Sequence, residues 1–377
     1  MQRYSIALLP GDGIGQEVVA AARRVLEAAG ERFDIRFEFK LYDWGSDYYF
    51  RHGLMMPVDA LERLREHDAL LLGAVGHPDI PDHITLHGML LPIRRGFDLY
   101  ANVRPAVLLP GVNSPLKGYE AGSIDLVVVR ENTEGEYAPV GGFVHHHHPA
   151  EVAVQTSVFT RQGCDRVIRF AFELARRREG KKRVTSVTKS NAQSYGMVLW
   201  DRVFREVAEE YPDIRTESLL VDAAAMDFVR RPSEFDVVVA SNLFGDILSD
   251  LSAILTGSIG LAASANLDPS RNNPSLFEPV HGSAPDIAGR GIANPLATIL
   301  AAAMMMEHLG RARPPRRSTA RCEAPWLRAR RSPRTWGARR LQPRPRPLSS
   351  QTCVDARPLT NRPILFQARP SGADENS

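Results

Sequence analysis

Two aspartates in a predicted helix are the residues of this chain best suited to holding a metal ion. Asp246 and Asp250 stand four positions apart, so a helix projects both carboxylates from one face, where the like charges repel unless a cation neutralises them. A hard divalent ion with oxygen ligands suits such a pair. The alternative is two solvated acids on a helix surface. Metal binding is favoured because the apolar segment FDVVVA precedes the pair, and α/β proteins bind ligands at the carboxyl ends of such strands.

Lys189 is the second candidate, because lysine is rare in most of the chain. Residues 1–310 hold 26 arginines and only five lysines, so a plain basic surface group is usually arginine here. Lysine, unlike arginine, can give up its proton and then act as a base. Lys189 follows the apolar and threonine-rich run 184–187, at the end of a predicted strand. A surface lysine is the alternative.

Three arginines could form an anion pocket. Arg94 and Arg104 bracket FDLYAN, and Arg130 opens RENTEGEY. A guanidinium binds a carboxylate through two parallel hydrogen bonds, so three that converge would hold an acidic ligand, although each alone is typically a surface residue. The run His145–His148 could bind a transition metal, but it follows two glycines in a predicted exposed loop, and we assign it no chemistry.

The elements that must position these side chains alternate between strands and helices. Apolar strands are predicted at 69–72, 124–129 and 235–240, and helices at 165–178 and 197–211. This alternation predicts an α/β protein with a largely parallel sheet. The opening segment YSIALLPGDGIGQEVV indicates a strand, a glycine turn and a helix. Its GxGxG spacing misses the dinucleotide fingerprint GxGxxG, so the turn either approaches a phosphate or is an ordinary strand-to-helix turn.

The net charge of +3 averages two unlike parts of the chain. Residues 311–377 carry 16 arginines, no lysine, four acidic residues and ten prolines, a net charge of +12, whereas residues 1–310 carry a net charge of −9. Prolines interrupt helices, so this Arg/Pro-rich tail is predicted to be non-globular. The longest apolar stretch, 295–306, is shorter than the roughly 18 residues that span a bilayer, and three cysteines show no disulfide or metal pattern. We therefore expect a cytoplasmic protein.

Seven motifs follow one another along the chain: LLPGDGIGQEV (8–18), PIRRGFDLYANVRP (92–105), RENTEGEY (130–137), TKSN (188–191), VDAAAMDFV (221–229), NLFGDILSD (242–250) and EPVHGSAPDIAGRGIANP (278–295). In this order they resemble the motifs of the metal-dependent β-decarboxylating dehydrogenases, the family of 3-isopropylmalate, isocitrate, tartrate and D-malate dehydrogenases. The resemblance covers residues 4–310 and is closest to the tartrate and D-malate branch.

The resemblance implies an isopropylmalate-dehydrogenase-like fold rather than the ordinary Rossmann fold. Two α/β domains would share the sheet. Residues 1–102 plus 257–310 would form the nucleotide-side domain, and residues 103–256 would carry the dimer interface with the metal and lysine site.

The resemblance also implies roles for the acidic and basic residues. Asp246 and Asp250, with Asp222 from a partner subunit, would bind Mg²⁺ or Mn²⁺. Lys189, also from the partner, would take the substrate's hydroxyl proton during hydride transfer, and Tyr137 would give a proton to the enolate after decarboxylation. Sharing residues across subunits makes a homodimer obligatory for activity.

The implied substrate is a small 2-hydroxy diacid. Its leaving carboxylate would be held by Arg94, Arg104 and Arg130. A regular helix before Arg94 places His87 and Leu90 on the face of that arginine, where they would meet the variable group of the substrate. The closest branch makes D-malate, converted to pyruvate and CO₂, and/or tartrate the expected substrate, with 3-isopropylmalate as the alternative.

The expected cofactor is NAD. Residues 281–294 resemble the family's adenosine site, where Asp286 would accept hydrogen bonds from the ribose hydroxyls and repel a 2′-phosphate, which favours NAD over NADP. The residues implied to bind the cofactor are Ile14, Asn191, Glu278, His281, Gly282, Ser283, Ala284, Asp286 and Asn294.

The resemblance ends at Gly310, where the family chain continues with a helix and a segment similar to Pro-Asp-Leu-Gly-Gly-Thr-Ala-Thr-Thr. Residues 333–342 can be encoded by a choice of codons that, read in another frame, encodes those nine residues in order. We therefore suspect that the tail is a frameshift product, which could leave an inactive family member.

Two further alternatives compete with an NAD-dependent decarboxylating dehydrogenase. An inactive protein could bind nucleic acid through the basic tail, but three aromatic residues there offer little for base stacking. An ordinary Rossmann dehydrogenase does not explain the two aspartates. We expect no nucleic-acid partner and no membrane.

Overall fold

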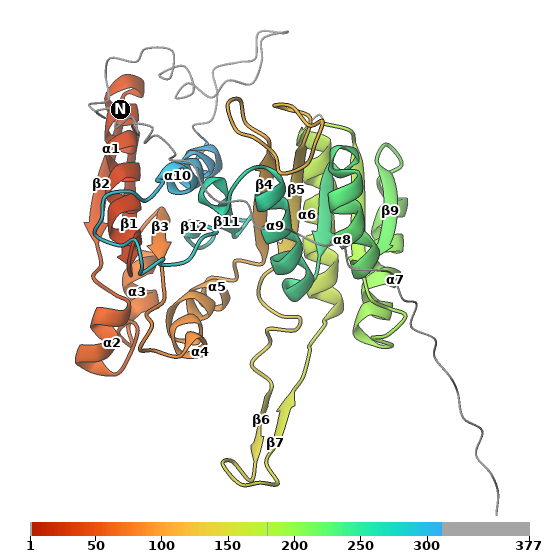
Figure 1. The fold of residues 1–377 in the computed structure, drawn as a ribbon, viewed down its shortest axis with the longest axis horizontal. Helices are drawn as coiled ribbons and strands as arrows, with labels where there is room; N and C mark the ends of the chain where they lie inside the picture. The colour runs from red at the N-terminus through yellow and green to blue at the C-terminus, as the bar shows by residue number, and fades with distance from the viewer. Residues whose placement is uncertain (1, 179, 311–377) are drawn as a thin grey trace, which may run out of the picture. The chain divides into compact units, whose positions relative to one another are not determined.

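One sheet of ten strands runs through the protein in the order β2-β1-β3-β12-β11-β4-β5-β10-β8-β9 (Figure 1). The computed structural model describes residues 2–178 and 180–310, so the predicted tail and the suspected frameshift lie outside the described residues. The strands are β1 (Gln2–Gly11), β2 (Ile35–Leu41), β3 (Ala69–Ala74), β4 (Ala101–Val107), β5 (Asp125–Glu131), β8 (Arg183–Thr188), β9 (Arg215–Leu220), β10 (Val237–Ala240), β11 (Ala263–Leu267) and β12 (Ser275–Pro279).

The sheet is parallel toward both edges and antiparallel in its centre. The pairs β12-β11, β11-β4 and β4-β5 are antiparallel, and the other six neighbouring pairs are parallel. The prediction of a largely parallel α/β sheet is therefore confirmed. The division into domains 1–102 plus 257–310 and 103–256 stays a prediction. The sheet is continuous across that division, because β4 and β11 pair with each other near the two predicted crossings.

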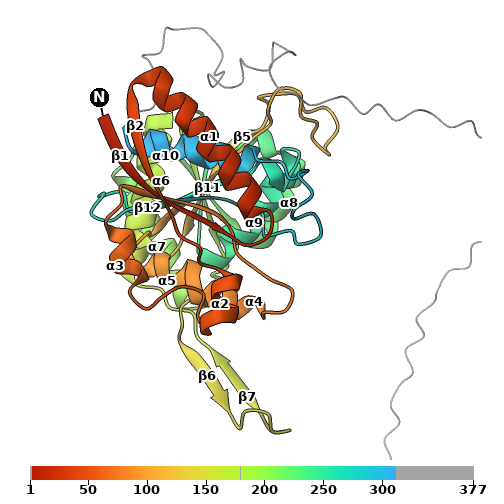
Figure 2. The same cartoon turned by 90° about the vertical axis from the view of Figure 1, so that its left-hand side faces the viewer.

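Helices cover both faces of the sheet. They are α1 (Gly15–Phe33), α2 (Ser46–His52), α3 (Ala60–Arg65), α4 (Asp82–Thr85), α5 (Leu91–Gly96), α6 (Arg161–Arg178), α7 (Gly196–Glu209), α8 (Val221–Arg230), α9 (Asn242–Leu255) and α10 (Leu296–His308), with a π-helical turn at Leu86–Leu90 and 3₁₀ turns at Pro232–Glu234 and Ile259–Leu261. Helices α1 and α10 pack together over β1, β3 and β12, whereas α6 packs on β5, β8 and β10, and α9 lies on β4, β5 and β10 beside α8 (Figure 2).

Strand β1 is apolar because both of its faces are buried. Ile6 and Leu8 pack in the core beneath α1, whereas Ala7 and Leu9 pack in a second core with α3 and α5. Side chains alternate between the faces of a strand, so burial of both faces favours apolar residues at successive positions. This packing fixes where β1 ends, and thereby where the glycine turn lies.

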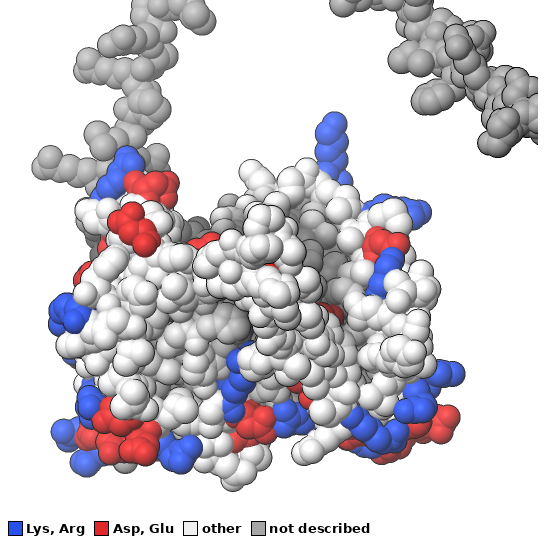
Figure 3. All heavy atoms as spheres, turned by 90° about the horizontal axis from the view of Figure 1, so that it is seen from below, with Lys and Arg blue, Asp and Glu red and all other residues white. Residues whose placement is uncertain are grey.

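A two-stranded arm projects from the body below the sheet (Figure 1). It consists of β6 (Gly141–Val144) and β7 (Val152–Gln155), whose residues are all exposed, and the run His145–His148 lies at its tip. Figure 3 looks onto the face from which the arm projects, and there uncharged side chains cover the middle while charged side chains of both signs gather toward the rim. Within the described ranges, no helix is long and apolar enough to cross a membrane.

Candidate active site

The glycine turn after β1 is packed against two other loops. Gly11 and Gly13 have φ values of 66° and 53°, in the left-handed region. A Cβ atom at Gly11 would lie 2.0 Å from the Ala74 carbonyl oxygen, and one at Gly13 would lie 2.1 Å from the Ser283 carbonyl oxygen. Only glycine combines this backbone with this approach, so the packing of the turn by itself accounts for both glycines.

Asp12, between these glycines, connects the turn to the start of α2 and to the loop after β3. Its buried carboxylate accepts hydrogen bonds from the backbone N–H and hydroxyl of Ser46, both at 2.7 Å, and from the N–H of Gly76 at 2.8 Å. Asp12 was not among the residues predicted from the sequence. The signal that could have identified it is an acidic residue between two glycines, because a buried carboxylate needs hydrogen-bond donors close by and glycines let backbone N–H groups approach it.

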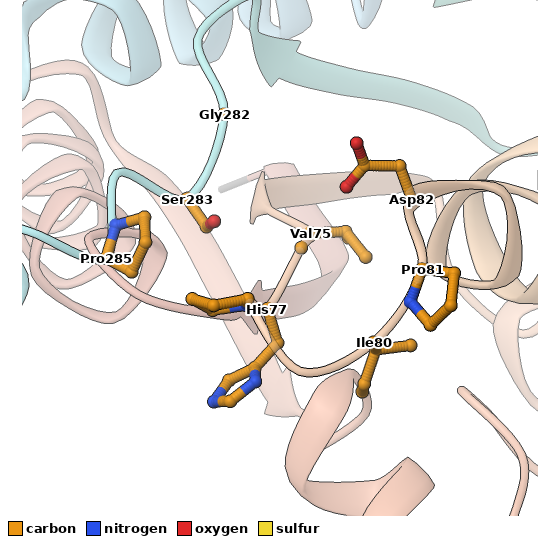
Figure 4. A pocket seen from close by; sticks show the side chains of 10 residues that line it. Val75, His77, Ile80, Pro81, Asp82, Gly282, Ser283 and Pro285 are labelled. Carbon is orange, nitrogen blue, oxygen red and sulfur yellow. The ribbon is translucent and has the colours of Figure 1, made fainter.

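A pocket of about 460 Å³ opens between the loop after β3 and the loop after β12 (Figure 4). Its lining includes Gly282 and Ser283, which were predicted to bind the cofactor, and also Val75, Gly76 and His77, which were not. His281 precedes Gly282 in the loop after β12, and its Nε2 is buried without a hydrogen-bond partner in the described part of the chain. An unpaired nitrogen in a loop that lines a pocket fits a bound nucleotide.

The other residues predicted to bind the cofactor are more dispersed. Ile14 is buried, and its N–H donates to a carbonyl of the loop after β12 at 2.9 Å. Ala284 and Asp286 lie in that loop, the latter exposed, and the exposed Asn294 accepts from the first turn of α10. Asn191 is exposed and follows β8, which lies near the opposite edge of the sheet from β1 and β3.

All three predicted arginines are buried, which rules out the surface alternative for each. Arg94, Arg104 and Arg130 expose 3%, 7% and 1% of their surface. Arg104 lies 3.1 Å from the Asp246 carboxylate, and Arg130 contacts the same oxygen atom. Asn242 accepts from Arg130 Nε at 3.0 Å and from its NH2 group at 2.7 Å. Burial and the charge of Arg104 lower the pKa of Arg130 to about 9, so it stays charged at neutral pH.

Arg94 pairs with Glu278 rather than with an aspartate. Its NH2 group donates to Glu278 Oε1 at 2.7 Å, and both side chains are buried. Arg94 Nε is buried without a hydrogen-bond partner in the described part of the chain. A guanidinium with one edge free fits a carboxylate ligand. Glu278, predicted to bind the cofactor, serves here to orient an arginine.

Asp246 lies at the centre of the charged cluster. Tyr137 donates to Asp246 Oδ2 at 2.8 Å. Burial acts to raise the pKa of Asp246, but the charges of Arg130 and Arg104 outweigh it and hold that pKa below the usual value. Asp250, one helical turn later and 3.4 Å from Arg104, has a raised pKa because burial and the charge of Asp246 disfavour its ionised form. Arg104 contacts both carboxylates, and such a pair on one helix face offers oxygen ligands of the kind that a divalent cation prefers.

Lys189 and Asp222 form a pair of their own. Lys189 Nζ lies 3.0 Å from Asp222 Oδ2, and neither side chain contacts Asp246 or Asp250 in residues 2–178 and 180–310. Across those same residues, no group of three or more His, Cys, Asp or Glu side chains is arranged to hold a metal ion. The prediction that Asp222 reaches a partner subunit stays a prediction.

The helix that carries His87 is not regular. Residues 86–90 are π-helical, between α4 and α5, so the spacing that put His87 and Leu90 on the face of Arg94 is wrong for this turn. Leu90 is half-buried and His87 is exposed. Partial burial and the charges of Arg95 and His83 lower the pKa of His87, so its imidazole is neutral at neutral pH.

Acidic residues in RENTEGEY hold the backbone around the site through hydrogen bonds, and no role was predicted for them from the sequence. Glu131 is buried and accepts from the N–H groups of Thr133 and Glu134. Glu136 accepts from the Ser241 hydroxyl at 2.8 Å and so joins this loop to the start of α9. The signal was a group of acidic residues at the end of a buried strand and just after it, which is too common to identify such contacts.

A profile of the family described as isocitrate/isopropylmalate dehydrogenase matches residues 5–318. The chain belongs to this family. It is 53% identical over 311 residues to a probable tartrate dehydrogenase/decarboxylase of Agrobacterium vitis, covering 82% of this chain and 87% of that protein. It is 55% identical over 312 residues to the D-malate dehydrogenase (decarboxylating) of Escherichia coli K12, covering 82% and 86%.

Solved structures of this family have the same fold. The crystal structure of an isocitrate dehydrogenase from Methylococcus capsulatus superposes with a TM-score of 0.73 at 41% identity, covering 82% of this chain and 86% of that one. The predicted family, its isopropylmalate-dehydrogenase-like fold and the class of decarboxylating dehydrogenase are confirmed. The predicted tartrate and D-malate branch is confirmed by the names of the similar proteins.

Proposed function

We propose that this protein catalyses the NAD-dependent oxidative decarboxylation of a small 2-hydroxy diacid, D-malate to pyruvate and CO₂ and/or tartrate. The observation that carries the proposal is the convergence of two buried arginines and a tyrosine on one aspartate. Arg104, Arg130 and Tyr137 all meet the carboxylate of Asp246. The names of relatives at 53% and 55% identity support the same substrates.

Arg104 and Arg130 are the groups that would bind the leaving carboxylate, together with the free edge of Arg94. In the structure, Asp246 neutralises Arg104 and Arg130. A substrate carboxylate would replace one aspartate oxygen with another carboxylate oxygen, so the buried guanidinium groups would keep a negative partner throughout. Decarboxylation follows oxidation because the hydroxyl-bearing carbon, which neighbours the carbon that carries the leaving carboxylate, must first become a ketone. That ketone then accepts the electron pair of the broken C–C bond as an enolate, and the carboxylate leaves as CO₂.

Asp246 and Asp250 are the residues of this chain that would hold Mg²⁺ or Mn²⁺, with Asp222 of a second subunit. Burial is the main cause of the raised pKa of Asp250, and a cation held between the two carboxylates would favour its ionised form. When bound, the cation supplies positive charge that stabilises the ketone oxygen and the enolate. The carboxylates are oxygen ligands of the kind that these ions prefer.

Lys189 and Tyr137 are the proposed proton carriers. Lys189 would accept the hydroxyl proton, and Tyr137 would donate to the enolate carbon. Burial, and then the charge and hydrogen bond of Asp246, raise the pKa of Tyr137, so the phenol keeps its proton at neutral pH and can act as an acid. NAD, bound in the pocket between the loops after β3 and β12, would accept the hydride.

We further propose that the active unit is a homodimer. Helices α8 and α9 pack side by side, and both expose large apolar side chains, as does the arm. An isolated two-stranded ribbon is marginally stable, so an arm with exposed apolar side chains indicates that a second copy covers it. The exposed apolar residues are Met226, Val229, Ile247 and Ile254 on the helices and Phe143, Val144, Val152 and Val154 on the arm.

A substrate panel tests the proposed function. With Mn²⁺ and NAD, the purified full chain is expected to oxidise D-malate with a kcat/KM about tenfold or more above that for 3-isopropylmalate, because the relatives of 53% and 55% identity are named for tartrate and D-malate, and one differing substrate group is worth a factor of this size. L-malate is the matched control, since it has the same charges and the opposite hydroxyl configuration. NADH formation measures each rate. A higher kcat/KM for 3-isopropylmalate would overturn the substrate assignment.

A further inference from the structure

A row of polar side chains crosses the buried centre of the sheet. Asn102 on β4 is the register partner of Asn266 on β11, and on its other side it is the register partner of Arg130 on β5. Directly opposed residues of antiparallel strands point to the same face of the sheet, so these three side chains form one row. Asn102 and Asn266 are completely buried, and neither has a role in the proposed chemistry.

The two amides connect the hydrogen bonds of Arg94 and Arg104. Arg104 Nε donates to Asn102 Oδ1 at 2.9 Å, and Asn102 Nδ2 donates to Asn266 Oδ1 at 2.7 Å. Asn266 Nδ2 donates to Glu278 Oε1 at 2.9 Å, the same oxygen that accepts from Arg94 at 2.7 Å. The row therefore runs without interruption from one arginine to the other.

Each amide in the row has only one orientation that satisfies both neighbours. The carbonyl of Asn102 must face Arg104, so its NH₂ group must face Asn266, and the same logic turns the NH₂ group of Asn266 toward Glu278. Successive hydrogen bonds of this kind strengthen one another in a low-dielectric interior. The two arginines are thereby held in a fixed mutual arrangement.

Stability alone does not require this row. Burying an amide costs free energy that its hydrogen bonds only offset, and apolar side chains of the same shape fill such a site about as well. What apolar side chains cannot do is orient a guanidinium. A buried polar row that ends on two ligand-binding arginines therefore indicates a role in the geometry of the ligand site.

We propose that Asn102 and Asn266 are positioning residues, which fix Arg94 relative to Arg104 so that both guanidinium groups meet one diacid. The inference rests on the proposed function and extends it to residues that touch no substrate. This role explains why Asn266 on β11 and Glu278 on β12 belong to the hydrogen-bonded row between Arg94 on α5 and Arg104 on β4, where these strands lie in the centre of the sheet. The loss of either amide would leave the arginines in place but free to reorient.

Leucine variants of the full chain test this role. Asn102→Leu and Asn266→Leu are expected to weaken malonate binding, measured by calorimetry, and to raise the KM for D-malate, each by about tenfold or more, because hydrogen bonds to charged groups are lost. The matched control is Ser264→Ala. The Ser264 hydroxyl accepts from Asn102 at 2.8 Å but lies outside the path between the arginines, so this variant should bind malonate as the wild type does.

The double variant separates positioning from folding. Asn102 and Asn266 share a hydrogen bond, and each keeps another partner when the other is replaced, Asn102 the Ser264 hydroxyl and Asn266 the Asn132 amide. The loss of melting temperature in Asn102→Leu/Asn266→Leu should therefore be smaller than the sum of the two single losses, while malonate affinity stays low. Folded leucine variants that bind malonate as tightly as the wild type would overturn the inference, and so would an equal loss in Ser264→Ala. Malonate binding needs no turnover, so a wild type that binds malonate but oxidises no diacid contradicts the proposed function while the variants still decide the inference.

Discussion

The substitution Asp246→Asn is expected to lower kcat/KM for D-malate by about 100-fold or more, because it removes the negative partner of two buried arginines. Asparagine has the shape of aspartate and still accepts a hydrogen bond from Tyr137, so the variant tests charge rather than packing. Its second expected effect is a higher Mn²⁺ requirement, since one carboxylate ligand is lost. Initial rates over a range of Mn²⁺ concentrations measure both effects.

The matched control for this variant is Asp165→Asn on α6. Asp165 also accepts from an arginine, Arg169, at 2.8 Å, but both side chains are partly exposed and lie on another helix. Partly exposed pairs contribute little, so the control should keep wild-type rates and the wild-type Mn²⁺ requirement. If the two variants behave alike, Asp246 has no special place in the site.

Two inactive variants, Lys189→Met and Asp246→Asn, are expected to restore activity when they are expressed together. Lys189 pairs with Asp222 in its own subunit and contacts neither Asp246 nor Asp250. If Lys189 serves the partner's Asp246, a mixed dimer contains one site with both native residues. Random pairing makes half of the dimers mixed, which gives about a quarter of the wild-type activity.

The same experiment contains its own controls. Each variant expressed alone should be inactive. A mixture of Asp246→Asn with Asp250→Asn, both of which keep Lys189, should also stay inactive, because both aspartates lie on α9 of one subunit. Recovery of activity in that second mixture, or none in the first, would contradict a site shared between subunits.

The sequence predicted those features that depend on local pattern. The opening segment indicated a strand, a glycine turn and a helix, which are β1, the turn at Gly11 to Gly13 and α1, and four-residue spacing put Asp246 and Asp250 on one face of α9. Motifs also indicated that Arg104 and Arg130 would lie together. These predictions succeed because strand and helix periodicity, and the charge of a side chain, are properties of short segments.

Contacts between distant segments were beyond the sequence. Asn102 and Asn266 are 164 positions apart, and their pairing depends on strand order and register, which no local pattern encodes. The π-helical turn at His87 and the pairing of Glu278 with Arg94 were missed for a related reason, since each is decided by the packing of neighbouring elements rather than by residue type.

The central claim is that the protein couples oxidation to decarboxylation at one site, and the ratio of products tests it most directly. With D-malate, NAD and Mn²⁺, NADH and pyruvate are quantified in the same reaction, with EDTA in a parallel sample. The account predicts one pyruvate for each NADH and loss of both products with EDTA. NADH without pyruvate, or equal turnover with EDTA, would contradict it.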